Sequence, residues 1–145
     1  MSDRALSVTV NYVMSIGIAT LLLSVLIVST GASIEDRREE AIRAELEVVG
    51  QRLAASIESA DRLAGAGGED VVLDVALPER LAGKAYEVQV SPGPGSPDLL
   101  LETSDPAVSV SVGFTNSTPV ESKTVSGGTL RVVLADDGDL EVRAP

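Results

Sequence analysis

The chain opens with a long run of apolar residues. No charged residue occurs from Ala5 to Ile34, a stretch of 30 residues, and its most apolar part lies between Val13 and Val28. A helix needs about 20 predominantly apolar residues to cross the hydrocarbon core of a bilayer. The pattern therefore predicts a transmembrane helix over residues 6–33.

Beyond residue 33 the pattern becomes that of an amphipathic helix over residues 34–64. Charged residues four positions apart, Glu39 with Arg43 and Glu58 with Arg62, are expected to form ion pairs on its exposed face. The stripe of apolar residues either packs against the rest of the same chain or forms a seam between chains, and we expect the first. Its members recur every three or four positions: Ile42, Leu46, Val49, Leu53, Ile57, Ala60 and Leu63.

Residues 69–145 change to a period of two, which is typical of β-strands. Breaks rich in glycine, proline and aspartate separate the strands, and those at 126–128 and 137–138 resemble hairpin turns. Short strands with frequent turns favour an antiparallel sandwich or a single curled sheet. The expected fold is α+β: a long N-terminal helix followed by a small antiparallel β-sheet or sandwich head. Strands are predicted over residues 71–77, 85–90, 99–103, 108–114, 120–125, 130–135 and 140–143.

Small and polar residues interrupt the apolar segment. We expect the polar ones to share roughly one sector of the helix, with Gly17 nearby, where they would favour close helix–helix packing in lipid. The alternative is that the hydroxyl groups bond to carbonyl groups of their own helix. The residues are Ser7, Asn11, Ser15, Gly17, Thr20 and Ser24.

The charge of the chain narrows the class of partner. It carries 22 acidic and 11 basic residues, a net charge of −11. A field of this sign repels nucleic acid and anionic head groups, so we expect no nucleic acid as partner. The apolar segment makes the lipid bilayer the expected partner. Acidic composition with few lysines also resembles the composition of proteins from extreme halophiles.

Side chains for chemistry are scarce. The chain has no Cys and no His, which removes disulfides, thiol catalysis and the commonest general base and metal ligand. The acidic run Asp136–Asp139 lacks the spacing of a calcium-binding loop, and a solvated hairpin turn is the preferred interpretation. We therefore expect no enzyme activity, no cofactor, no metal and no small-molecule substrate.

The residues ahead of the apolar segment suggest how the chain is processed. Arg4-Ala5-Leu6-Ser7 is similar to the class III signal of archaeal type IV pilin-like proteins. That resemblance implies cleavage between Ala5 and Leu6, with residues 1–5 as a leader. The chain departs from the pattern at Val10, where bacterial pilins have Glu. An uncleaved anchor and signal-peptidase cleavage after Thr30-Gly31-Ala32 are the alternatives.

Two segments of the β-rich region extend the resemblance to haloarchaeal type IV pilin-like proteins of unknown function. They are residues 78–83, which lead into a strand bearing Tyr86, and residues 124–130. The resemblance implies a structural subunit that crosses the membrane once, with a cytoplasmic N-terminus and an extracellular head. It also implies self-assembly, or assembly with other pilin-like subunits, through the N-terminal helix. The alternative is an anchored or secreted β domain that binds another envelope protein.

Asn116-Ser117-Thr118 is an acceptor sequence for an N-linked glycan. The motif is short, so an ordinary polar loop is the competing interpretation. Modification of Asn116 requires the β-rich domain to lie outside the cytoplasm.

Overall fold

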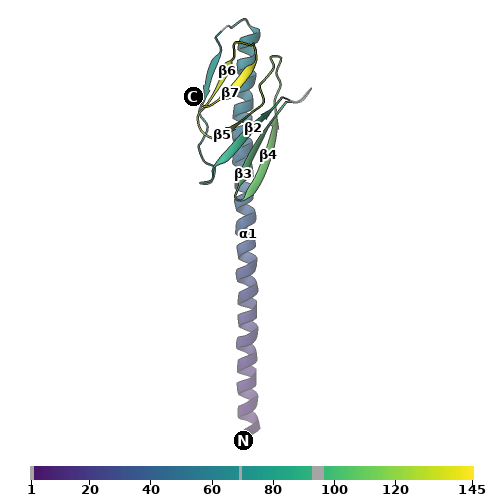
Figure 1. Ribbon diagram of the computed structural model, residues 1–145. Coiled ribbons are helices and arrows are strands. Elements are labelled where there is room, and N and C mark those ends of the chain that lie inside the picture. The colour runs from purple at the N-terminus through teal and green to yellow at the C-terminus, as the bar shows by residue number, and fades with distance from the viewer. Residues whose placement is uncertain (1, 69, 93–96) are drawn as a thin grey trace. The chain divides into compact units, whose positions relative to one another are not determined.

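The computed structural model describes residues 2–68, 70–92 and 97–145 (Figure 1). It contains one helix, α1 (Ser2–Gly65), followed by seven strands. The chain divides into two compact units, Met1–Arg38 and Glu39–Pro145. The second unit takes in most of the predicted amphipathic segment together with all of the strands, and we refer to it as the head. The α+β fold predicted from the sequence is confirmed.

Seven strands form in the regions where the alternating pattern predicted them. Their bounds are β1 (Val72–Val75), β2 (Tyr86–Ser91), β3 (Asp98–Ser104), β4 (Ala107–Gly113), β5 (Lys123–Ser126), β6 (Leu130–Leu134) and β7 (Leu140–Arg143). Alternate side chains of β2 and β3 face inward, and all of them except Thr103 are apolar. The side chains between them are polar except for Leu100. This alternation is what one buried sheet face requires.

The strands form two antiparallel sheets. One has the order β4-β3-β2-β5 and the other the order β1-β6-β7. The segment before β5 joins them, because Leu140 donates a backbone hydrogen bond to Pro119 and accepts one from Glu121. An ion pair between Lys123 and Glu141 adds a side-chain link between β5 and β7. The β-strands thus make one layer of two connected sheets.

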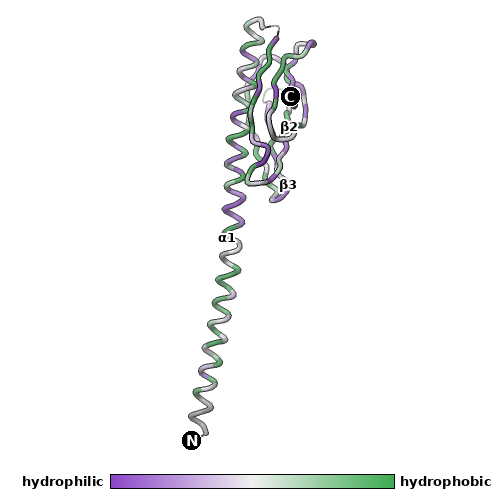
Figure 2. The backbone as a smooth tube through the Cα atoms, turned by 90° about the vertical axis from the view of Figure 1, so that its left-hand side faces the viewer, coloured by the Kyte–Doolittle hydropathy of each residue, from purple (hydrophilic) through white to green (hydrophobic). Residues whose placement is uncertain are grey.

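The helix supplies the other layer of the head. Six of the seven stripe residues, from Ile42 to Ala60, are buried in one core with inward side chains from both sheets. Only Leu63 departs from the prediction, with 51% of its surface exposed. Packing of the stripe against the chain's own sheets is therefore confirmed. In Figure 2 the part of α1 beside the strands alternates between hydrophobic and hydrophilic residues.

Gly50 lets the helix approach the sheet closely. A Cβ atom at this position would lie 2.7 Å from Cγ2 of Val112 and 2.9 Å from Cδ1 of Leu101. Glycine costs about 1 kcal/mol relative to alanine inside a helix. The contact with β3 and β4 explains why the helix contains glycine here.

One of the two predicted hairpin turns is wrong. Residues 137–138 do join the paired strands β6 and β7, and Gly138 has φ of 92°. Residues 126–128 instead carry the chain from one sheet to the other, because β5 pairs with β2 whereas β6 pairs with β1 and β7. Glycine-rich spacing indicates a turn, but it does not specify which strand the chain joins afterwards.

Candidate functional site

The N-terminal part of α1 is long and apolar enough to cross a membrane. Its most apolar window of 18 residues has a mean hydropathy of 2.3 and is 0% buried. The large apolar side chains described in this unit are all exposed, including Leu21 at 67% and Leu26 at 63%. Continuous apolar surface of this extent is unfavourable in water. It is consistent with a membrane anchor.

Hydroxyl groups in this segment bond to their own helix. Ser15 donates to the carbonyl of Asn11 at 2.8 Å, and Thr20 donates to that of Ile16 at 2.9 Å. Ser24 donates in the same way to the carbonyl of Thr20. These bonds satisfy the donors without a second helix. No hydrogen bond involves the Asn11 side chain among the residues that the structure describes, so its exposed amide would need a partner in lipid.

The expectation that the polar residues share roughly one sector is wrong. The helix is continuous from Ser2 to Gly65, and each residue turns the side-chain direction by about 100°. Asn11 and Ser15 therefore lie on one side, with position 7, whereas Gly17, Thr20 and Ser24 lie on nearly the opposite side. The spacing within each group is helical, but the five positions from 15 to 20 turn the second group away from the first.

The predicted cleavage site lies at the start of α1. The backbone of residues 5–7 is helical, and the side chains of Ala5, Leu6 and Ser7 lie outside the described part of the structure. Cleavage between Ala5 and Leu6 remains a prediction.

The loop that contains Asn116 is held against the helix by two carboxylates. Glu58 accepts hydrogen bonds from the backbone N–H and the hydroxyl group of Thr115, at 3.1 and 3.2 Å. Asp61 accepts backbone bonds from Ser117 at 3.1 Å and from Thr118 at 2.7 Å. Glu58 is thus engaged with a loop 57 residues away, rather than in the ion pair that its spacing from Arg62 predicted.

Asn116 itself is half-buried in this loop. Its Nδ2 donates a hydrogen bond to the carbonyl of Thr118 at 2.6 Å. A glycan would be attached to the same nitrogen atom. The nitrogen carries two hydrogen atoms, of which a glycan would replace one, so the modification is compatible with this bond.

Asp61 has a pKa below its ordinary value. Partial burial alone would raise the pKa, but the hydrogen bonds from Thr118 and Ser117 and the charge of Arg62 outweigh that cost. Each of these interactions favours the ionised carboxylate. The bonds from Asp61 to the loop are therefore charge-assisted.

A third helix carboxylate contacts the turn between β1 and β2. Leu81 and Lys84 exchange backbone hydrogen bonds of 2.8 Å, and the two residues between them have positive φ angles, 46° at Ala82 and 80° at Gly83. Glu45 accepts a bond of 3.2 Å from the N–H of Ala82. The loop contacts of Glu45, Glu58 and Asp61 were not predicted from the sequence, because their partners lie 37 to 57 residues away.

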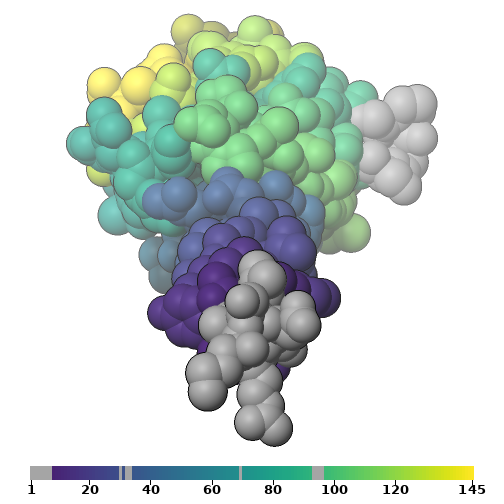
Figure 3. Space-filling model, turned by 90° about the horizontal axis from the view of Figure 1, so that it is seen from below, coloured from purple at the N-terminus to yellow at the C-terminus, as the bar shows by residue number. Residues whose placement is uncertain are grey.

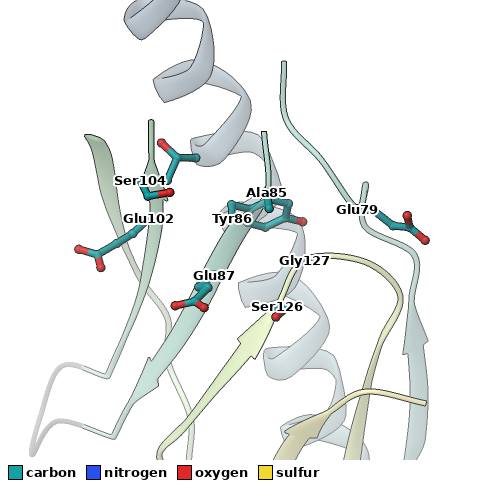
Figure 4. A pocket seen from close by; sticks show the side chains of 9 residues that line it. Glu79, Ala85, Tyr86, Glu87, Glu102, Ser104, Ser126 and Gly127 are labelled. Carbon is teal, nitrogen blue, oxygen red and sulfur yellow. The ribbon is translucent and has the colours of Figure 1, made fainter. Parts of the chain in front are cut away.

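A hollow of about 360 Å³ lies over the start of β2 (Figure 4). Its floor includes Tyr86, which is buried and donates a hydrogen bond from its hydroxyl group to the carbonyl of Pro78 at 2.8 Å. Burial raises the pKa of this hydroxyl group. Glu79, Glu87 and Glu102 are at the rim, and Figure 4 shows their carboxylates pointing in different directions. Across residues 2–68, 70–92 and 97–145, no group of three His, Cys, Asp or Glu residues is placed to hold a metal ion.

The acidic run Asp136–Asp139 is a hairpin turn, as the preferred interpretation held. Ala135 donates a backbone hydrogen bond to Asp139, and Gly138 donates one to Ala135. Asp137 accepts a bond from the N–H of Asp139 at 3.2 Å. Its carboxylate therefore stabilises the turn.

Comparison with known families covers nearly the whole chain. Residues 1–144 match the family of unknown function DUF7266. The chain belongs to this family. No curated protein and no solved structure matches it significantly. Membership in DUF7266 brings no activity, substrate or partner with it, so the function has to be argued from the helix and the head.

Proposed function

We propose that this member of DUF7266 is a membrane-anchored, pilin-like surface subunit without catalytic activity. Residues 6–33 hold it in the membrane with the N-terminus in the cytoplasm, and the head lies outside the cell. Its partners are the bilayer and other subunits of the same kind. Cleavage between Ala5 and Leu6 removes the leader and leaves the apolar helix on the mature protein.

The proposal rests on the two roles of α1, as an apolar segment and as part of the head. Its N-terminal part exposes an apolar surface on all sides, and the part after Arg38 provides the central element of the head. A signal sequence that is cleaved off does not have to be continuous with a helix of the core. A subunit that uses one helix both as its membrane anchor and as part of its core requires that continuity.

The chemistry of the head favours a structural role. It lacks His and Cys, and several of its carboxylates bind loops or basic side chains, as Asp61 and Asp74 do. The hollow at Tyr86 has three glutamates at its rim but no base paired with a nucleophile among its lining residues. General acid–base chemistry needs such pairs within hydrogen-bond reach.

Mass spectrometry of the protein purified from its native membranes tests the proposal. A mature N-terminus at Leu6 supports a pilin-like subunit, and one at Ser33 contradicts it. An intact Met1 or Ser2 supports the simple anchor. Protease treatment of intact cells, followed by detection of head peptides, tests the orientation, and a glycan on Asn116 would demonstrate an extracytoplasmic head independently.

The alternative function is an anchored or secreted head that binds another envelope protein. The core begins at Ile42, so release at Ser33 would leave every buried core residue on the secreted fragment. Secretion is therefore physically compatible with the fold. An N-terminus at Ser33, together with recovery of the protein from the medium, would establish this alternative.

A further inference from the structure

The β-layer ends in two strands that each have one unpaired edge. β4 is the terminal strand of one sheet and β1 is the terminal strand of the other, while segment 119–121 occupies the outer edge of β7. β4 lies at the right-hand margin of the head in Figure 1, and the green surface that includes β3 and β4 is uncovered in Figure 3. Unpaired strand edges are templates for pairing with another chain.

The hydrogen bonds at the strand ends show which backbone groups face outward. Phe114 donates to Pro97 beyond the end of β4, so residues 108, 110 and 112 bond to β3 and residues 107, 109, 111 and 113 direct their N–H and C=O groups to the open edge. Leu134 donates to Val71 beyond the end of β1. By the same alternation, residues 72 and 74 direct their backbone groups outward from β1.

The edge of β4 carries neither the charged side chains nor the proline that usually prevent pairing. Seven consecutive residues of β4, Ala-Val-Ser-Val-Ser-Val-Gly, include no charge and no proline. The one acidic residue of β1, Asp74, is neutralised by Arg131 at 2.7 Å. In a chain with a net charge of −11, these are surfaces that two copies can bring together without strong repulsion.

The two edges run in opposite directions. The end of β4 leads to Thr115, which bonds to Glu58 near the end of the helix, so β4 runs with the helix. β1 begins beside Gly68 and leads to Ala82, which bonds to Glu45 near the start of the head's helix, so β1 runs against it. Two copies with parallel helices therefore present antiparallel edges to each other.

We propose that copies of this protein assemble head to tail, with β4 of one copy pairing with β1 of the next. The inference rests on the proposed function, since it specifies the contact through which anchored subunits assemble. The matching register places Val72 opposite Ser111 and Asp74 opposite Ser109. Contacts of this kind are heterologous and generate rings or open filaments.

Side chains on the two edges match in this register. Val72, Asp74, Ser109 and Ser111 all lie on the exposed outer face of the layer. On the inner face Leu73, which is only half-buried, lies opposite Val110, which is also half-buried. Pairing thus continues the apolar face from one copy to the next and buries surface that a single copy leaves open.

A symmetric pairing of β4 with β4 is the main competitor. An antiparallel β4 pair would reverse the helix of the second head, because β4 runs with the helix. Pairing of β4 with β1 keeps the helices parallel.

Disulfide cross-linking in native membranes tests the contact between β4 and β1. The chain contains no Cys, so any disulfide must form between the introduced residues. The double variant Val72→Cys/Ser111→Cys is expected to give a ladder of disulfide-linked multimers, because Cα atoms of such pairs lie about 5.5 Å apart. Each single variant alone is expected to stay monomeric. The matched control is Val72→Cys/Thr124→Cys, since Thr124 is exposed on β5 away from both open edges.

Three outcomes contradict the proposal. They are a dimer from Ser111→Cys alone, a ladder of equal yield from the control pair, and no ladder from the test pair. Amine- and carboxyl-directed cross-linking of the unsubstituted protein distinguishes failure of the β4–β1 contact from failure of the proposed subunit function. Multimers there, with a mature N-terminus at Leu6, would leave the subunit role intact and exclude only this contact.

Proline variants give a second test. Ser109→Pro removes an N–H that has no partner within one copy, so unfolding is expected to be unchanged while multimer formation becomes about fivefold weaker. Val110→Pro is the matched control, because it removes an N–H bonded to β3 and should destabilise the head itself. Unchanged multimers in Ser109→Pro would contradict the pairing.

Discussion

The carboxylate of Asp61 lies 2.7 Å from the backbone nitrogen of Thr118, a residue 57 positions further along the chain. The same carboxylate accepts a bond from Ser117. Together with Glu58, this helix side chain thus holds the loop that carries Asn116.

Asp61→Asn is expected to lower the free energy of unfolding by about 1–2 kcal/mol. The amide can still accept one hydrogen bond, but it loses the charge that strengthens both. Chemical denaturation monitored by circular dichroism measures the effect. Glu40→Gln is the control, since Glu40 is exposed on the same helix. An equal loss in both variants would contradict the assigned role of Asp61.

The contribution of Asp61 is expected to depend on pH. Its pKa in the folded state is lower than in the unfolded state, so the stabilisation is complete above the unfolded pKa of about 4. It disappears as the pH falls through the folded pKa. The difference in unfolding free energy between the unsubstituted protein and Asp61→Asn should therefore be constant from pH 5 to 7 and decrease below about pH 4. A constant difference down to pH 2 would be the contrary result.

Gly50→Ala sets two effects of opposite sign against each other. Alanine is favoured over glycine in a helix by about 1 kcal/mol, whereas overpacking costs about 1–3 kcal/mol. Val112 is β-branched and cannot move its methyl group easily, so we expect net destabilisation. Thermal unfolding measures it. Gly65→Ala is the control, because nothing lies within 4 Å of its Cβ position, and its stability should stay equal or rise.

Gly127→Ala is expected to destabilise the head by about 1–3 kcal/mol. A Cβ atom at this position would lie less than 3 Å from three ring atoms of Tyr86, whose ring is buried and cannot move aside. Tyr86→Phe should cost about 1 kcal/mol, because it leaves the carbonyl of Pro78 without the hydroxyl donor. If Gly127→Ala were neutral, the close packing on Tyr86 would not be present in solution.

Asn11→Leu is expected to weaken association of the full chain in detergent. Its amide needs a hydrogen-bond partner on another helix in an apolar environment, and leucine does not. Ser24→Leu should have a smaller effect, because the Ser24 hydroxyl already bonds to Thr20. Sedimentation or chemical cross-linking of both variants gives the comparison, and a larger effect of Ser24→Leu would reverse the assignment of the two helix faces.

Sequence patterns predicted the elements of this fold better than their connections. The apolar stripe from Ile42 to Ala60 and the alternation in β2 and β3 follow from burial, which is periodic and local. The destination of the chain after Gly127 is not local, because β6 pairs with β1, which lies far earlier in the sequence. The partner of Glu58 was missed for the same reason: its spacing favoured Arg62, and the loop at Thr115 provides two donors.

The contact of α1 with both sheets also has a mechanical consequence. Within the head, the helix has its buried side chains in one row from Ile42 to Ala60. A force that pulls the head's helix along its axis is therefore borne by this row. These side chains share the load along the helix, so the interface resists a pull in shear as a unit.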